Sequence, residues 1–485
     1  MSQPTVTGAP APTETRRRQL LHVAGVLGLV VTVGAVALFV LGKKGHEPDA
    51  PAPDTSAREA AGERLRDAVA AVDHLDPRWR FAELEEDRAK VSAAENAAPL
   101  VRASAILIPD EMKRLDHNVL RERLRNGTLG DKPRADIEPA KAMLSQARKL
   151  IDYSRGRHAV TWNLEDPLLT LLPHLRDTDD VVNLLTLDAE VRAHEGDVDG
   201  ALVSAHAALV AARTTGDEPM LVSQLRRPGW HHYSAKALEE SLRRGRGSEE
   251  NLRAVQTALD NEAAEPLLRT TARAERAGLH GLMTALEKRE LKYADWVLLG
   301  ARAEGVSLIL QRQSLSRHLA RLEDVHAWLI DYTTQLVEIA GLPSREQAPR
   351  LQKLASATRT APPEAIPLLA ALPILDIDET CRKGQALLRC AAAGMALEQY
   401  RLANDGWPDN LDRLVPKYLA KVPADPFDGK PLRYAKYKEG VAVYSVGPGG
   451  KEGARPDDLD QFEKDGGSLV SFRLWNVESR NKGKP

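Results

Sequence analysis

The densest group of polar and aromatic side chains in the sequence is residues 230–233, which contain two adjacent histidines. Imidazole is a common zinc ligand, and a helical zinc site uses two histidines on one face, as positions i and i+4 provide. Adjacent histidines point to different faces of a helix, so a metal site here would need a further ligand such as His206 or His280. The spacing favours an exposed or interface pair over a metal centre.

Four glutamates, Glu262, Glu265, Glu275 and Glu287, could supply the paired carboxylates that general acid and base catalysis uses. Helices this rich in charge produce such pairs without a catalytic role, so solvated helix faces are the expected reading. The chain contains no CxxC, HExxH, Walker-type glycine loop or GxSxG pattern, which removes the enzyme classes that these motifs define. We therefore expect no catalytic residue and no organic cofactor, with an extracytoplasmic hydrolase as an alternative.

The two cysteines, Cys381 and Cys390, are too few for a disulfide scaffold. On one continuous helix their spacing puts them on opposite sides and about 13 Å apart along the axis, beyond the reach of a disulfide. We expect two buried free thiols.

The elements that position these residues should be largely α-helical. Lys and Arg number 67, Asp and Glu number 69, and only 4% of residues are aromatic, a composition with high helix and low strand propensity. The net charge of −2 gives no indication of nucleic-acid binding. A chain of this length usually forms more than one core, so two or three structural units are expected.

An apolar run over residues 20–42 predicts a transmembrane helix. Its 23 positions would form a helix about 34 Å long, enough to cross a hydrocarbon core of about 30 Å. Arg16, Arg17 and Arg18 precede the run, and this cluster favours a cytoplasmic N-terminus and an extracytoplasmic body. The expected partner is therefore a membrane, which the chain crosses once.

The competing interpretation of this run is a cleaved signal peptide, because residues 35–37 read Ala-Val-Ala. Apolar residues continue to Leu41, so that motif lies inside the run rather than after it, which favours an uncleaved anchor. A buried core helix is disfavoured by the length of the run and by the proline-rich linker that follows it.

Helical periodicity continues through the body. Three blocks, residues 181–194, 198–215 and 220–243, are separated by Glu-Gly-Asp and Thr-Gly-Asp turns, and a further stretch over 249–287 is broken at Pro266. Short turns imply antiparallel neighbours. Residues 195–217 resemble a tetratricopeptide-like helical hairpin, although no 34-residue recurrence accompanies them.

The last part of the chain has a different pattern. A helix over residues 383–404, apolar on two sides, is followed by a loop with Trp407-Pro408, Val415-Pro416, Val422-Pro423 and Asp425-Pro426-Phe427. Alternating segments over 441–446 and 468–475 then predict strands. Residues 386–475 resemble the globular domain of the major pseudopilins of type II secretion, which implies a helix packed on a small antiparallel sheet. The chain lacks the processed Gly-Phe motif and the membrane-helix glutamate of that family, which indicates a pilin-like fold outside a pilus subunit.

The same resemblance implies a calcium ion in the loop after the second strand, held by carboxylate and carbonyl oxygens. The candidate ligands are Glu452, Asp457, Asp458 and Asp460. Where the family's loop supplies an aspartate, this chain has residues 447–450, Gly-Pro-Gly-Gly, so one carboxylate ligand is missing and a solvated loop is the alternative.

The expected fold class is mainly α, with a helical-repeat-like array and a small C-terminal α+β domain. The expected order is a disordered cytoplasmic tail (1–18), a transmembrane helix (19–42), a linker (43–57), a helical array (58–342), a linker or connecting helix (343–380), a pseudopilin-like domain (381–478) and a disordered tail (479–485). The order of anchor, linker, Asp-Pro-x-Trp-x segment at 76–80, Glu-Asn-Ala-Ala segment at 95–98, helical array and pilin-like end resembles uncharacterised single-pass bacterial envelope proteins. This resemblance implies a bacterial source and the inner membrane as the location. Together with the anchor and the helical hairpins, it predicts a membrane-anchored scaffold of the bacterial envelope that binds another envelope protein. The alternative is an accessory component of a type II secretion or pilus-like system.

Overall fold

The structure is a computed structural model and describes residues 55–114, 117–125, 133–163, 170–288, 322–358, 361–362, 374–449, 458–459, 461–464 and 469–480. The expected tail 1–18 and transmembrane helix 19–42 lie outside these residues. Within the described ranges, no helix combines the length and the apolar character that crossing a bilayer requires.

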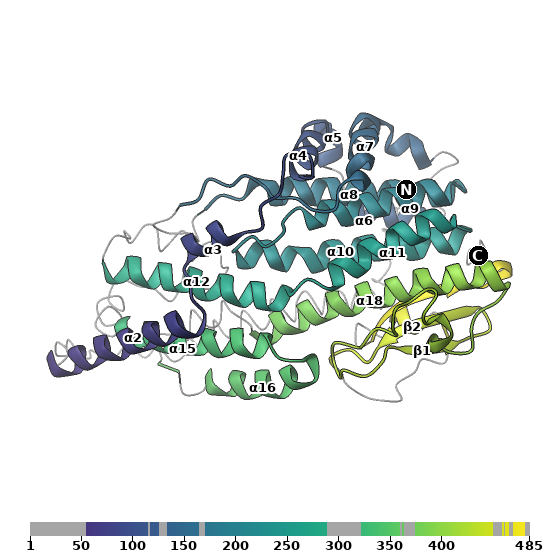
Figure 1. The fold of residues 1–485 in the computed structure, drawn as a ribbon. Coiled ribbons are helices and arrows are strands. Elements are labelled where there is room, and N and C mark those ends of the chain that lie inside the picture. Colours follow the sequence, from purple (N-terminus) through teal and green to yellow (C-terminus); the bar gives the residue numbers. More distant parts are fainter. Residues whose placement is uncertain are drawn as a thin grey trace, which may run out of the picture. The chain divides into compact units, whose positions relative to one another are not determined.

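The described chain is mainly helical, with one small antiparallel sheet near the C-terminus (Figure 1), as the sequence predicts. The α-helices are α2 (Thr55–Leu75), α3 (Phe81–Asp87), α4 (Ala98–Ile106), α5 (Asp110–Lys113), α6 (His117–Arg125), α7 (Lys141–Ala147), α8 (Pro173–His194), α9 (Val198–Arg213), α10 (Leu221–Arg244), α11 (Glu249–Ala263), α12 (Leu267–Glu287), α15 (Leu322–Ala340), α16 (Ser344–Ala357), α18 (Ile374–Asn404) and α19 (Gln461–Lys464). The strands are β1 (Arg433–Lys436), β2 (Gly440–Ser445) and β3 (Val470–Trp475). Short 3₁₀ helices cover Pro133–Asp136, Glu138–Ala140, Arg148–Asp152, Leu411–Leu414 and Val477–Ser479.

The chain divides into two compact units. Unit 1 comprises Met1–Asp67, Met283–Trp328 and Ala361–Leu372, and unit 2 comprises Ala68–Leu282, Leu329–Thr360 and Pro373–Pro485. In unit 1, Arg64 pairs with Asp324, and the Nδ1 atom of His326 lies 2.8 Å from a carboxylate oxygen of Glu287. All other packing described below lies within unit 2.

Helices α8, α9 and α10 pack against one another and are joined by short turns. Between α8 and α9, Gly196 has a φ of +86°, a backbone conformation that glycine adopts at low cost. Asp197 then caps α9 by accepting a hydrogen bond from the backbone N–H of Gly200 at 3.0 Å. The glycine and the capping aspartate that the sequence displays as a turn signal thus end one helix and start the next.

The packing of helix α18 on both sides explains why its sequence is apolar on two sides. One side packs on α10 and α11, and the other packs on β2 and β3. Leu388, Met395 and Leu397 belong to the same buried cluster as Leu238 and Leu252 of those helices. That cluster also contains Val443 and Phe472 of the sheet. The helical array and the sheet therefore share one hydrophobic core, with α18 as its centre.

The sheet has the order β1-β2-β3, and both pairs of neighbouring strands are antiparallel. Val443 of β2 lies opposite Tyr434 on one side and Phe472 on the other. The strands expected over 441–446 and 468–475 correspond to β2 and β3, while β1 lies in the stretch that the sequence showed only as a loop.

Asp425, from the Asp-Pro-Phe motif, ties the proline-rich loop to the sheet. Its fully buried carboxylate accepts hydrogen bonds from the backbone N–H groups of Phe427 at 2.9 Å and Val446 at 2.8 Å. The hydroxyl of Ser445 and the guanidinium of Arg433 donate to it at 2.8 and 2.7 Å. A buried carboxylate with four donors is satisfied, so this aspartate has a structural role.

Replacing Gly394 by alanine is expected to destabilise the protein by about 1–2 kcal/mol. An added Cβ would lie 2.4 Å from a ring carbon of Phe472, at the contact between α18 and β3. Gly229 in α10 is the matched control, because its added Cβ would meet nothing within 4 Å. Gly229→Ala should therefore stabilise the helix by about 0.5–1 kcal/mol. Thermal unfolding of the two variants tests the prediction, and equal shifts would contradict it.

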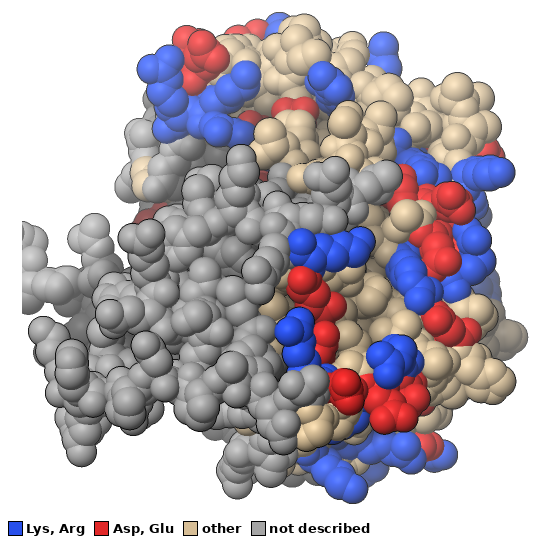
Figure 2. Space-filling model, turned by 90° about the vertical axis from the view of Figure 1, so that its left-hand side faces the viewer, with Lys and Arg blue, Asp and Glu red and all other residues tan. Residues whose placement is uncertain are grey.

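The visible surface of the described residues carries both signs of charge. Figure 2 shows Lys and Arg side chains interspersed with Asp and Glu side chains on this face. Mixed charges of this kind give no single-sign field to attract a polyanion, in keeping with the low net charge.

Candidate functional site

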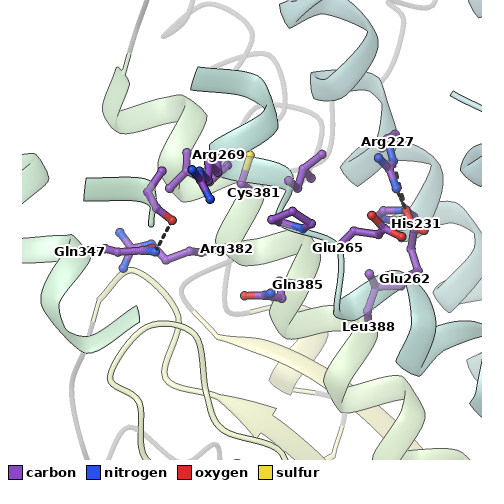
Figure 3. A pocket seen from close by; sticks show the side chains of 14 residues that line it. Arg227, His231, Glu262, Glu265, Arg269, Gln347, Cys381, Arg382, Gln385 and Leu388 are labelled. Atoms are coloured by element: carbon purple, nitrogen blue, oxygen red, sulfur yellow. Dashed lines mark hydrogen bonds and ion pairs between the residues drawn. The ribbon is translucent and has the colours of Figure 1, made fainter. Parts of the chain in front are cut away.

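A polar pocket of about 130 Å³ lies where α10, α11, α12, α16 and α18 meet, beside the end of α15 (Figure 3). In this view Arg227, His231 and Glu262 lie toward one end of the pocket, and Arg269 and Arg382 toward the other. Leu268 and Leu388 form apolar parts of the pocket wall. Charged groups from elements far apart in the sequence therefore meet around one small volume.

Glu262 is the centre of the buried end of the pocket. Arg227 forms an ion pair with it and also donates through Nε at 3.1 Å, and the Nε2 atom of His231 lies 2.8 Å from the same carboxylate oxygen. Arg213 approaches the second oxygen at 3.6 Å. The side chains of Arg227, His231 and Glu262 are each at most 3% exposed. These groups lie within reach of one another because α10 and α11 both pack on α9 and α18.

This arrangement holds Glu262 as an anion. Burial acts to raise the pKa of Glu262, but the Arg227 guanidinium and the hydrogen bond from His231 outweigh it, so the pKa lies well below its usual range. A general acid or base works best with a pKa near the working pH. Glu262 is therefore better suited to fixing the two helices and the imidazole than to transferring protons.

Cys381 also lines the pocket, and its chemistry is equally restricted. Burial, with a smaller effect from Asp378, raises the pKa of its thiol to about 12. The thiolate is the reactive form of cysteine, so this thiol is inert at neutral pH. Cys381 and Cys390 are both free and buried on α18, as predicted from their spacing.

The glutamines of the pocket hold its walls together. Gln385 of α18 donates to the backbone carbonyl of Ala263 at 3.0 Å, at the end of α11. Gln347 of α16 donates to the carbonyls of Ala340 and Leu342 at 3.2 and 2.8 Å. These bonds satisfy carbonyl groups at helix ends, where no intrahelical donor is left.

The structure brings together two residues that the sequence indicated separately, His231 and Glu262. The sequence favoured an exposed or interface pair of histidines. His232 is exposed, whereas His231 is buried against Glu262 at the junction of two helices. His231 and Glu262 are 31 positions apart, and periodicity does not show which faces of two separate helices meet. The buried Arg227 is the residue of this group that the sequence reasoning missed.

The other glutamates are not part of this group. Glu265 pairs with Arg213 at 2.9 Å on the pocket rim, and Glu287 pairs with His326 in unit 1. Glu275 is buried, and burial raises its pKa to about 8. The expectation of solvated faces is therefore wrong for Glu262 and Glu275.

No group of three His, Cys, Asp or Glu side chains within the described ranges has the geometry of a metal site. His206 is largely buried, and burial lowers its pKa to about 4. Of the calcium candidates, Glu452, Asp457 and Asp460 lie outside the described residues. Asp458 accepts a hydrogen bond from the backbone N–H of Gln461 at 2.8 Å, at the start of α19. Calcium binding by this loop stays a prediction.

Comparison with protein-family models, with curated proteins and with solved structures found no match to this chain. Inferences about function therefore rest on the residues of this chain.

Proposed function

We propose that this chain is a membrane-anchored scaffold of the bacterial envelope, whose extracytoplasmic body binds another protein. The single observation that carries the proposal is the core shared by the helical array and the sheet around α18. A sheet and an array that bury one common core present a continuous, fixed surface, which is what a binding scaffold needs. Residues 20–42 would supply the anchor.

The chemistry of the pocket supports binding over catalysis. Glu262 is ion-paired with a lowered pKa, and the Cys381 thiol has a raised pKa, so neither is prepared as a nucleophile or proton carrier. The groups that meet there stabilise helix contacts and leave a polar cavity. An extracytoplasmic hydrolase, the alternative class, would need a further group such as a metal, and elemental analysis of the purified protein tests for it.

Site-specific photo-crosslinking in cells tests the proposal. Ile106, Leu171 and Val222 are large apolar side chains with 73%, 71% and 45% exposure, and a photoreactive residue at each would report neighbours. The expected result is a discrete adduct with another envelope protein from at least one position. Exposed Arg253 on α11, which pairs with Glu249, serves as the control position. Absence of adducts at all three apolar positions would argue against a scaffold.

The location of the body is tested separately. We expect protease added to intact spheroplasts to digest residues beyond 45 and to leave the N-terminal tail protected. The mass of the mature N-terminus distinguishes an uncleaved anchor from cleavage after residues 35–37. A cytoplasmic body would contradict the proposal.

A second candidate function is an accessory role in a type II secretion or pilus-like system. It rests on the resemblance of residues 386–475 to pseudopilin domains, and the order of helix, loop and antiparallel sheet is compatible with it. Affinity capture from envelope fractions should then recover secretion components. Repeated recovery of other partners without them would exclude this role.

A further inference from the structure

Residues 154–158, here called the strap, join two parts of unit 2 that lie far apart in the sequence. On one side, the backbone N–H of Ala97 donates to the carbonyl of Arg155 at 3.1 Å. The side chain of Asn96 accepts a hydrogen bond from the backbone N–H of Arg157 at 2.8 Å and donates one to its carbonyl at 3.0 Å. These three hydrogen bonds fix the backbone of the strap against the segment before α4.

The other side of the strap lies on the turn between α9 and α10. Gly156 approaches this turn so closely that an added Cβ would lie 2.8 Å from the side chain of Thr214, which is fully buried. In the same turn, the carbonyl of Gly216 accepts a hydrogen bond from the guanidinium of Arg227 at 2.9 Å. The strap therefore covers a turn that also helps to hold the buried arginine of the pocket.

His158, the last residue of the strap, is buried as a neutral imidazole. The hydroxyl of Thr214 donates its one proton to the carbonyl of Ala211 at 2.6 Å, so it accepts a hydrogen bond from the Nε2–H group of His158 at 2.9 Å. The ring of His158 also stacks on the ring of His174, at the start of α8, with centroids 4.5 Å apart. A proton added to Nδ1 of His158 would place a positive charge inside this packing.

The groups around His158 oppose such a charge. The titratable and charged groups on the elements packed against it are His174 of α8, whose Nε2 contacts Glu218 at 3.0 Å, Arg88 after α3, which pairs with Glu85 and Asp217, Arg157 of the strap, which pairs with Glu85, and Arg102 of α4. Burial, followed by His174, Arg88 and Arg102, lowers the pKa of His158 from 6.5 to about 3. In a released strap the imidazole would reach water and regain its ordinary pKa.

We propose that the strap is an acid-sensitive latch, in which protonation of His158 releases residues 154–158 from the α9–α10 turn and uncovers Thr214. The released strap binds the proton more tightly than the closed strap does, so acid favours release. The closed strap is most stable above pH 6.5 and loses stability as the pH falls toward about 3. The latch is independent of the proposed scaffold function, and it makes the exposure of this turn depend on pH.

Hydrogen exchange of the full-length protein in detergent tests the latch at the amides of Ala97 and Arg157, whose hydrogen bonds tie the strap down. Their protection factors, corrected for the effect of pH on intrinsic exchange, should fall about twentyfold from pH 7 to pH 5, because only the released strap takes up a proton in this range. His158→Gln keeps a donor for Thr214, His158→Phe keeps a ring on His174, and neither side chain can be protonated. Both variants should remove most of the fall.

The matched control is His194→Gln, which removes an exposed histidine at the end of α8 and should keep the fall seen in wild type. Circular dichroism at pH 5 should show that the helices of wild type stay folded, so that release is local. Constant protection of the two amides in wild type, or a fall in both His158 variants as large as in wild type, would overturn the inference. Loss of helix in wild type at pH 5 would also overturn it, because exchange would then report unfolding of the whole protein.

Discussion

Replacing Glu262 by glutamine is expected to lower the free energy of unfolding by about 3–5 kcal/mol, because the substitution leaves Arg227 buried without its counter-ion. Arg227 is 3% exposed, and its guanidinium also holds the carbonyl of Gly216 at 2.9 Å, so it cannot turn to water without disturbing the turn before α10. The hydrogen bond that His231 makes to the carboxylate is weakened at the same time. Thermal and denaturant unfolding of the full-length protein measure the loss.

Glu250→Gln on the same helix α11 is the matched control, because Glu250 is exposed and makes no interaction with described residues. Its effect should stay within about 0.5 kcal/mol. The double variant Arg227→Met with Glu262→Leu replaces the pair by apolar groups and should recover part of the lost stability. A double variant less stable than Glu262→Gln, or a single variant as stable as wild type, would show that the pair does not stabilise the helix contact.

Much of the helical layer could be predicted from the sequence. The turn with Gly196 and Asp197, the break at Pro266 and the end of the last long helix at Asn404 all occur where local signals indicate them. Such signals depend on the backbone freedom of a few residues, so they act within one or two turns and need no knowledge of the fold. Residues 137–153, inside the expected helical array, are less regular, since a short α-helix there is flanked by two 3₁₀ segments.

Contacts between elements could be predicted from the sequence only in part. The two apolar sides of the helix with Leu388 and Met395 indicated burial on both sides, but not that one partner would be the array and the other the sheet. Amphipathic periodicity identifies the face of a helix that is buried and gives no information on its neighbour. Pairing of distant elements is a property of the tertiary packing, as the 31 positions between His231 and Glu262 illustrate.

The buried charges mark the places where elements of different kinds meet. Glu262 joins α11 to α10, and Asp425 joins the proline-rich loop to the strands. Each carboxylate is surrounded by donors, which offsets the cost of its burial. Buried charges in this protein therefore fix how these elements are placed. Composition alone would put the same charged residues on solvated surfaces.

Another of these contacts joins α10 to the edge of the sheet. Glu239 of α10 accepts hydrogen bonds from the backbone N–H of Arg473 at 2.9 Å and from its guanidinium at 2.6 and 3.1 Å. Both side chains are almost fully buried. Strand β3 is an edge strand of the sheet. The Glu239 carboxylate therefore accepts a hydrogen bond from a backbone N–H that no neighbouring strand pairs with.

Replacing Glu239 by glutamine is therefore expected to cost about 3 kcal/mol at pH 7 and to loosen β3 from α10. Burial acts to raise the pKa of Glu239, but Arg473 and Lys236 outweigh it and lower the pKa from 4.5 to about 2. A lowering of this size corresponds to about 3 kcal/mol of stability, since one pKa unit is about 1.4 kcal/mol. Hydrogen exchange at the Arg473 amide should accelerate in the variant.

The pH dependence of this effect has a definite sign. Because the pKa is lower in the folded state, the contribution of Glu239 is fully present above pH 4.5 and is lost as the pH falls toward about 2. Wild type and Glu239→Gln should differ most at neutral pH and converge in acid. Glu240→Gln is the matched control. The carboxylate of Glu240, next to Glu239 in the sequence, pairs with Arg244 on the same helix at 2.8 Å and should contribute under about 1 kcal/mol to stability. The stability difference between wild type and Glu239→Gln could instead stay constant from pH 7 to pH 2. That result would show that the loss comes from packing and that the charge of Glu239 does not hold the sheet against the helical array.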